Sequence, residues 1–281
     1  MTQPVTQPVT RPVPETTPSI GGTGTAVYVF AVCRSADASR LARLPGLDGS
    51  IGPVRALPFG ELVAVVQDVP AADLSPEAWT QRLTDARELE RCARAHHAVV
   101  TAAAADGPAV PMALAVLYNG DNRARAALSA DADRFRAALG RIEGRVEWGV
   151  KVYAARPETP PGPPAKVDDP DGAAPSGAGR AYLERMRGLQ RAREDGHAAA
   201  LRAAREVHAA LRELAVEART LRLHEAQPTG DRRTQFLNAA YLVARTDGER
   251  IAAAVEALRH RTGTQIELSG PWVPYSFAGR G

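Results

Sequence analysis

The stretch Thr25-Ala-Val-Tyr-Val-Phe-Ala-Val-Cys33 is the clearest indication of the fold. Its residues are almost all β-branched, aromatic or small and apolar, which is typical of a β-strand. The run is apolar at nearly every position rather than at every second one. We therefore expect a central strand that is covered on at least one face of its sheet and partly on the other.

The elements that follow this strand predict an α+β fold. A turn at Pro58-Phe59-Gly60-Glu61 separates two further strands. A long helix is expected to begin near Ser75, because Pro76 and Glu77 suit a first helical turn. The order favours helices on one face of a mixed or antiparallel sheet, close to a ferredoxin-like sandwich with an addition. The expected strands and helices span residues 25–33, 36–44, 54–57, 62–68, 77–105, 110–118, 121–139 and 146–154.

Two segments of unusual composition divide the chain. Residues 1–24 consist mainly of Pro, Thr, Gln, Val and Gly, so we predict a disordered tail. Seven prolines within residues 156–178 predict a Pro/Gly-rich linker. The sequence thus predicts an N-terminal domain over 25–155 and a C-terminal domain over 179–281.

The C-terminal domain is expected to be a second α+β unit that begins with a long helix. Leu201, Ala204 and Leu211 form an apolar stripe on a helix of about 35–40 residues. The almost wholly polar stretch 190–196 before them predicts a turn that projects into solvent. Further elements are expected at residues 219–224 (strand), 228–231 (turn), 236–245 (strand), 248–261 (helix) and 264–268 (strand).

Charge and hydropathy argue against nucleic acid and membrane partners. The chain has 35 Lys and Arg against 32 Asp and Glu, and the two signs are interleaved rather than gathered in a basic stripe. No apolar run approaches the roughly 20 residues that span a bilayer. No secretory signal is recognisable, so we expect a cytoplasmic protein. Cys33 and Cys92 are expected to be reduced core residues, with a disulfide between them as the lesser alternative.

Catalytic signatures are missing from the sequence. His96 and His97 are adjacent on a helix and point about 100° apart, so we predict one core-facing and one exposed imidazole rather than a metal pair. There is no activated nucleophile and no phosphate-binding loop. We predict no catalytic residue, cofactor or metal, and hence no enzyme. Two alternatives stay open, which are an enzyme or ligand-binding protein on a ferredoxin-like scaffold and a regulatory nucleic-acid binder using the Arg-rich helix 180–222.

The C-terminal tail is the most distinctive segment. Gly270-Pro-Trp-Val-Pro-Tyr-Ser-Phe277 places three aromatic residues and two prolines within eight positions. Proline restricts the backbone, so the aromatic side chains can be committed to pockets. The tail is expected to lock the last strand onto the fold, within one domain or across both. The alternative is an aromatic contact surface for a partner.

This tail is similar to the Gly-Pro-Trp-Pro-Pro-Tyr-Ser-Phe ending of the gas vesicle F/L family. Other blocks resemble the family in the same order, and two positions depart from it. Met112-Ala113 stands where relatives carry an arginine, and Val273 stands where proline is common. The matching blocks are Tyr28–Val32, Phe59–Val66, His96–Val100, Glu147–Val152 and Phe236–Val243.

The resemblance implies an accessory protein of gas vesicle assembly. It implies binding of the small hydrophobic shell protein through residues 25–155, help with nucleation or growth of the shell, and contacts with other gas vesicle accessory proteins. It places the protein in the cytoplasm and at the gas vesicle. The motif residues are expected to have a structural role; they are Gly270, Pro271, Trp272, Pro274, Tyr275, Ser276 and Phe277.

Overall fold

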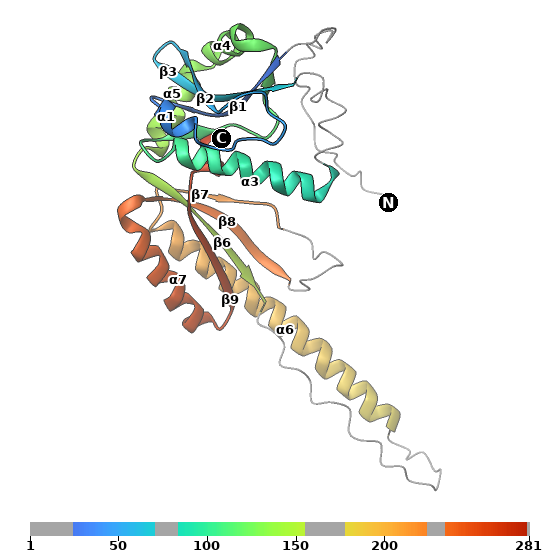
Figure 1. Ribbon diagram of the computed structural model, residues 1–281. Helices are drawn as coiled ribbons and strands as arrows, with labels where there is room; N and C mark the ends of the chain where they lie inside the picture. Colours follow the sequence, from blue (N-terminus) through green and yellow to red (C-terminus); the bar gives the residue numbers. More distant parts are fainter. Residues whose placement is uncertain (1–24, 71–83, 155–177, 224–233, 280–281) are drawn as a thin grey trace, which may run out of the picture.

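The computed structural model describes residues 25–70, 84–154, 178–223 and 234–279. The predicted tail 1–24, the linker up to residue 177, the helix start at 75–77 and the turn at 228–231 lie outside these residues. The described chain combines helices with two sheets whose strand pairs are all antiparallel (Figure 1). This confirms the predicted mixture of helices with an antiparallel sheet.

The first sheet, sheet A, is built around β1. Its strand order is β2-β3-β1-β4, and β5 pairs with the first part of β1. The side chains of Val27 and Val29 face one side of the sheet, and those of Tyr28 and Phe30 face the other. Both sides are buried, which goes beyond the partial cover expected on the second face. The strands are β1 (Thr25–Cys33), β2 (Arg55–Phe59), β3 (Leu62–Pro70), β4 (Ala109–Pro111) and β5 (Leu117–Tyr118).

Helices cover both faces of sheet A, so the prediction of helices on one face is wrong. Val99 and Val100 of α3 pack with Tyr28 and Phe30, whereas Phe135 of α5 packs on the opposite face. A strand that is apolar on both sides needs a covering layer on each. The helices are α1 (Ala38–Leu41) and α3 (Ala86–Ala103) on one face, and α4 (Gly120–Ala130) and α5 (Ala132–Ile142) on the other.

The second sheet, sheet B, has the strand order β7-β8-β6-β9. Helices α6 and α7 cover one of its faces, where Val207 and Leu211 of α6 meet Tyr241 of β8 and Ile251 of α7. The strands are β6 (Arg145–Tyr153), β7 (Glu217–Thr220), β8 (Gln235–Ala244) and β9 (Gln265–Trp272). The helices are α6 (Ala178–Arg212), the short η2 (Arg245–Asp247), α7 (Gly248–Thr262) and, at the tail, α8 (Tyr275–Ala278).

The placement of residues 146–154 differs from the prediction. They were expected to close the first domain, but β6 pairs with β8 and β9 and is a central strand of sheet B. The apolar alternation of Val146, Val150 and Val152 suits either sheet, so the sequence does not specify the partner strand. The segment predicted as an interdomain linker therefore joins β6 to α6, two elements that pack on the same sheet.

Two predicted elements are each split in the structure. The strand expected over 110–118 is two short strands, because the chain turns at Ala115, whose φ is 67°. The helix expected over 121–139 changes direction at Asp131, between α4 and α5. The break keeps both Leu128 and Phe135 in one core. Pro111 is the last residue of β4 and marks the first break. No glycine or proline lies within 121–139, so the second break depends on tertiary packing.

The two sheets share one hydrophobic cluster. Ala240 and Leu242 of β8 lie on the face of sheet B opposite α6 and α7, and they join the core beneath Val27, Val29 and α5. Along the chain each sheet forms by the same sequence of strand, helix, two strands, helix and strand. Each also has the same spatial order, in which the second and third strands precede the first and the fourth.

Candidate functional site at the junction of the sheets

The predicted tail motif reaches from sheet B to sheet A. Gly270, Pro271 and Trp272 are the last residues of β9, which pairs with β6, and the chain then enters the short helix α8. Gly270 has a φ of 131°, and a Cβ there would lie 2.8 Å from the Glu147 carbonyl oxygen and 3.1 Å from the Trp148 ring. Only glycine allows this close approach to β6.

The aromatic residues of the motif have two different surroundings. Phe277 is completely buried in the cluster that joins the two sheets, and Val273 packs on the cluster beneath α3. Trp272 and Tyr275 remain 45% and 36% exposed. The tail thus has a buried anchor at Phe277 and exposed rings beside it.

Polar contacts fix the tail between three elements. The buried carboxylate of Glu147, on β6, accepts hydrogen bonds from the Ser276 N–H and Oγ, both at 2.7 Å. Arg219 of β7 donates to the Ser276 carbonyl at 2.7 Å, and its guanidinium lies 5.3 Å from the centre of the Phe277 ring. Arg141 of α5 donates to the Phe277 carbonyl at 3.3 Å. These bonds satisfy backbone groups that burial would otherwise leave unpaired.

Burial raises the pKa of Glu147, while the Ser276 hydrogen bonds and the charge of Arg219 act in the opposite direction. Desolvation is thus the largest influence on this carboxyl group. Its hydrogen bonds to Ser276 give this carboxylate a role in positioning the tail.

The two adjacent histidines face different parts of the molecule. His96 is buried, and its Nδ1 shares a 2.9 Å hydrogen bond with the Tyr28 hydroxyl, as expected for the core-facing imidazole. Burial lowers the pKa of His96 to about 4, and the Met112 backbone partly offsets this. His97 is half-buried rather than exposed, because the tail covers it.

His97 connects α3 to the tail. Its Nδ1 lies 3.2 Å from the Tyr275 hydroxyl, and its ring centre lies 5.6 Å from that of Trp272. Burial raises the pKa of Tyr275 to about 12. The histidine pair and the tail are both distinctive in the sequence, but the 178 positions between His97 and Tyr275 leave no local sign that they meet. His97, Trp272 and Tyr275 are called the aromatic patch below.

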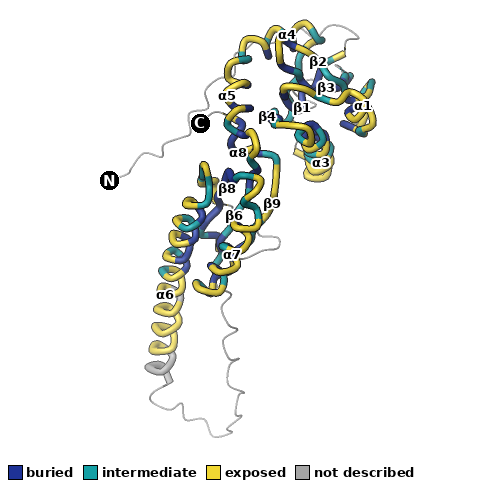
Figure 2. Tube along the Cα trace, turned by 90° about the vertical axis from the view of Figure 1, so that its left-hand side faces the viewer, coloured by how far each residue is buried: buried dark blue, intermediate teal, exposed yellow. Residues whose placement is uncertain are grey.

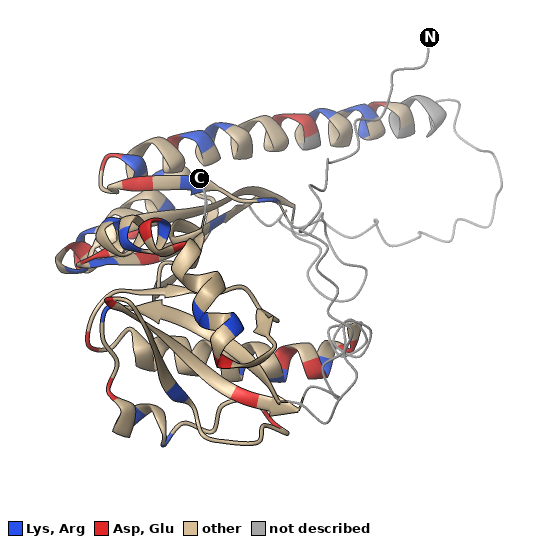
Figure 3. Ribbon diagram, turned by 90° about the horizontal axis from the view of Figure 1, so that it is seen from above, with Lys and Arg blue, Asp and Glu red and all other residues tan. Residues whose placement is uncertain are grey.

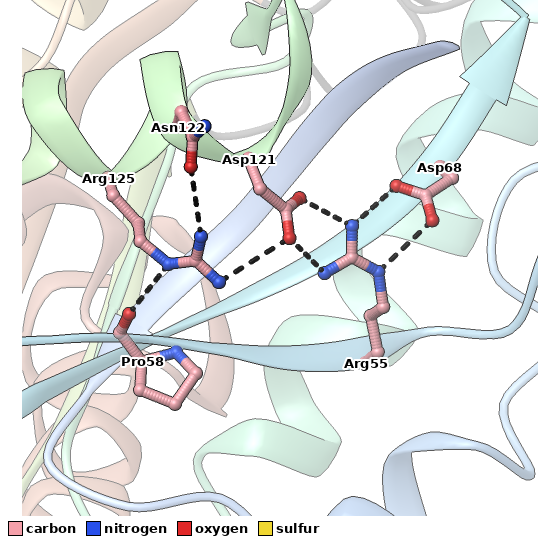
Figure 4. Close-up of polar contacts among 6 residues, drawn as sticks. All are labelled: Arg55, Pro58, Asp68, Asp121, Asn122 and Arg125. Atoms are coloured by element: carbon pink, nitrogen blue, oxygen red, sulfur yellow. Dashed lines mark hydrogen bonds and ion pairs between the residues drawn. The ribbon is translucent and has the colours of Figure 1, made fainter.

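A separate group of charges, which sequence analysis did not identify, lies at the edge of sheet A (Figure 4). Arg55 of β2 makes two hydrogen bonds to Asp68 of β3, at 2.6 and 3.1 Å, and two to Asp121 of α4, at 2.7 and 3.2 Å. The bonds to Asp68 and Asp121 raise the pKa of Arg55. Arg125 donates to the Pro58 carbonyl at 3.3 Å and lies 3.5 Å from Asp121. The group fastens α4 to the sheet, and its guanidiniums and carboxylates are mutually paired.

Within the described residues, no group of three or more His, Cys, Asp or Glu side chains could hold a metal ion. Cys33 and Cys92 are not joined by a disulfide, as expected, and burial raises the pKa of the Cys33 thiol to about 11. Such a thiol stays protonated and is a poor nucleophile. A search of the described helices found none with the length and hydropathy of a membrane span.

Comparisons with known proteins agree with the features of the tail. Residues 26–279 match the family model of the gas vesicle synthesis protein GvpL/GvpF. Gas vesicle protein L of Streptomyces sp. (strain CB03234) is 37% identical over 252 residues, which cover 90% of this chain and 92% of that protein. Gas vesicle protein F of the same strain is 26% identical over 253 residues, covering 90% and 99%.

Two crystal structures show a similar fold. GvpF from Anabaena sp. PCC7120 matches with a TM-score of 0.59 and 16% identity, over 92% of this chain and 97% of that one. GvpF from Microcystis aeruginosa matches with a TM-score of 0.58 and 16% identity, over 91% and 99%. At this level of identity the likeness concerns the fold.

Proposed function

The chain belongs to the gas vesicle synthesis protein GvpL/GvpF family, and on that premise we propose that it is an accessory protein of gas vesicle assembly which binds the small hydrophobic shell protein. In this role it assists nucleation or growth of the shell, in the cytoplasm and at the gas vesicle. The observation that carries the proposal is the family match over residues 26–279, nearly the whole chain. A protein of this kind needs a binding surface and no catalytic centre.

The physical reason for such a protein is the chemistry of the shell subunit. A small protein with an exposed apolar face aggregates unless another surface covers it. An adaptor that covers the face transiently would keep the subunit available for assembly. Such an adaptor should present rigid apolar or aromatic groups on an otherwise polar surface.

We place the contact on the outer side of α3, in the first half of the chain, together with the two tail rings, Trp272 and Tyr275, that lie against His97 of this helix. Strand addition to sheet A is disfavoured at β2, since Pro58 has no N–H and its carbonyl accepts from Arg125. The opposite edge, β4, contacts α5 and α8. The exposed rings of Trp272 and Tyr275 are of the types that dominate binding energies in interfaces.

Co-purification of the full-length chain with co-expressed shell protein tests this placement. Trp272→Ala should reduce the affinity by about tenfold or more, since truncation of a central tryptophan typically costs at least about 2 kcal/mol. Val216→Ala is the matched control, because Val216 is an exposed apolar residue next to β7 in the second half. Undiminished binding by the Trp272 variant, with loss in the Val216 variant, would overturn the assignment.

Full-length variants are preferable to a fragment of residues 25–155. Such a fragment would retain β6 without its partners β8 and β9, and it would lose Phe277 from the shared core. A failure of the fragment to bind could then reflect misfolding alone.

We also propose that each sheet and its helices form a ferredoxin-like unit. The support is the strand order, with the first strand between the third and the fourth in both sheets. The boundary between the units then lies between α5 and β6, near Gly144, rather than in the segment after residue 155.

A further inference from the structure

Helix α6 extends far beyond the sheet that it covers. It has 35 residues, about 50 Å at a rise of about 1.5 Å per residue, and its buried side chains begin at Ala200. Every described side chain from Leu183 to His197 is exposed. Figures 1 and 2 show this half of the helix projecting past the end of sheet B. It is called the overhang below.

The overhang presents an apolar stripe. Leu183, Met186 and Leu189 are 53%, 45% and 39% exposed and follow one another at intervals of three residues. Such a row forms a ridge of the kind that packs into the groove of another helix. A helix that is solvated on all sides is normally polar all round, so large apolar side chains at this spacing are unusual there.

The stripe continues the face of α6 that packs on sheet B. Its three residues lie 18 positions before Leu201, Ala204 and Val207 respectively, which is about five full turns at about 3.6 residues per turn. Ala204 and Val207 are buried in the core of sheet B. The same face of α6 therefore carries apolar packing residues along both halves of the helix. Along the overhang, no residue of the described part of the chain covers this face.

The charges beside the stripe indicate the chemistry of that partner. The overhang contains four arginines and three acidic residues, but Glu184 and Asp195 fall on the side opposite the stripe. On a helical projection, Arg185 and Arg187 flank the stripe on opposite sides, and Figure 3 shows the charged positions along the helix. A second copy of the chain would bring arginines against arginines. The segments outside the described residues that adjoin sheet B, 155–177 and 224–233, contain no Leu, Ile, Met or aromatic residue to fill the stripe.

We propose that the overhang is a docking site for an acidic amphipathic helix of another protein. Leu183, Met186 and Leu189 would form the apolar contact, and Arg185 and Arg187 would pair with carboxylates of the partner. An anionic lipid surface fits less well, because the stripe contains no Trp or Phe and is only three residues long. The inference does not depend on binding of the shell protein.

The test uses the full-length chain and a synthetic helical peptide of about four heptads, with leucine at the core positions and glutamate at the flanking ones. Fluorescence anisotropy should show saturable binding of this peptide and none of a version with lysine in place of glutamate. The variant Leu183→Gln/Met186→Gln/Leu189→Gln should weaken binding by about tenfold or more, since it removes the apolar contact.

The matched control is Gly188→Gln. This position lies on the side of the overhang opposite the stripe and is exposed, and a Cβ there meets no neighbouring atom within 4 Å. This variant should bind the peptide as the wild type does. Arg185→Gln/Arg187→Gln should reduce both the affinity and its dependence on salt.

Three results would overturn the proposal. One is equal binding of the acidic and lysine peptides, and another is undiminished binding by the triple glutamine variant. The third is stripe-dependent binding to vesicles of phosphatidylcholine and phosphatidylserine, or stripe-dependent dimerisation in sedimentation, without peptide binding. The last result would assign the overhang to a membrane or to a second copy.

Discussion

Sheets A and B have the same strand order but are covered in different ways. Sheet A lies between two layers of helices, and the helix after its first strand, α1, has only four residues. Sheet B has helices on one face, and the helix in the equivalent position, α6, has 35 residues. The comparison shows that strand order can stay constant while the connections between the strands vary widely.

The difference also separates stability from binding. Sheet A has a core of its own beneath α3, sheet B has one beneath α6 and α7, and a third cluster joins the two sheets. The overhang and the aromatic patch carry large apolar side chains that remain exposed outside these cores. Substitutions in the shared cluster should therefore affect folding, and substitutions in those exposed elements should affect binding.

The largest expected effect is at Phe277, the residue of the tail in the shared cluster. Phe277→Ala should lower the free energy of unfolding by about 3–5 kcal/mol, because it leaves a cavity between the sheets. Urea unfolding followed by circular dichroism and by tryptophan fluorescence measures it. Trp272→Ala, in the exposed part of the tail, is the control and should cost much less. If the Phe277 variant were as stable as the control, the sheets would be coupled by other contacts.

The next largest effect is a pH dependence of the free energy of unfolding, caused by His96 in the core of sheet A. The pKa of His96 falls from 6.5 to about 4 on folding, so the folded state binds fewer protons than the unfolded state between these values. Stability from this group is fully present above about pH 6.5 and is lost as the pH falls toward 4, by about 3 kcal/mol in total. Unfolding free energies measured across this range in wild type and His96→Gln should show a smaller loss in the variant.

Tyr28→Phe is the control for this pH dependence. It removes the hydroxyl that bonds to His96 but leaves the imidazole buried. Stability should be lower overall, and the loss on acidification should remain. A pH profile identical in wild type and His96→Gln would show that another group causes the acid sensitivity.

The sequence predicted the elements of sheet A better than their arrangement. The apolar run 25–33 predicts a central strand with one covered face and a partly covered second face, and the structure buries both faces. Which helices supply the layers depends on long-range packing. The same limit applies to β6, whose alternating valines fit either sheet and whose true partners come about 80 or more residues later in the chain.

The sequence identifies the tail residues of the candidate site, but it does not indicate which residues they contact. Three aromatic residues and two prolines mark the tail in any sequence comparison. The partners Glu147 and Arg219 have no local feature that distinguishes them from other charged residues. They become important only because the fold buries one beside Ser276 and places the other over Phe277.

A smaller effect is expected at Ser276, whose bonds to Glu147 hold the tail on β6. Ser276→Ala removes the 2.7 Å bond from Oγ, and hydrogen bonds to charged groups contribute about 1.5–3 kcal/mol. Burial raises the pKa of Glu147 in the folded state. The stability that Glu147 contributes is therefore present at low pH, where the carboxyl group is protonated, and is lost as the pH rises through the raised pKa. The variant should lose more stability than wild type on passing from about pH 4.5 to neutral pH. A constant difference between the two at all pH values would argue against this linkage.

The smallest effect on stability is expected at the overhang, although its effect on binding should be large. Leu183→Gln/Met186→Gln/Leu189→Gln replaces exposed side chains with another good helix former, so the free energy of unfolding should stay within about 0.5 kcal/mol of wild type. Leu211→Gln on the packed half of the same helix is the comparison, since it places an amide in the core of sheet B and should destabilise strongly. Equal destabilisation by the two would show that the overhang packs within the chain, and its stripe would then not be open to a partner.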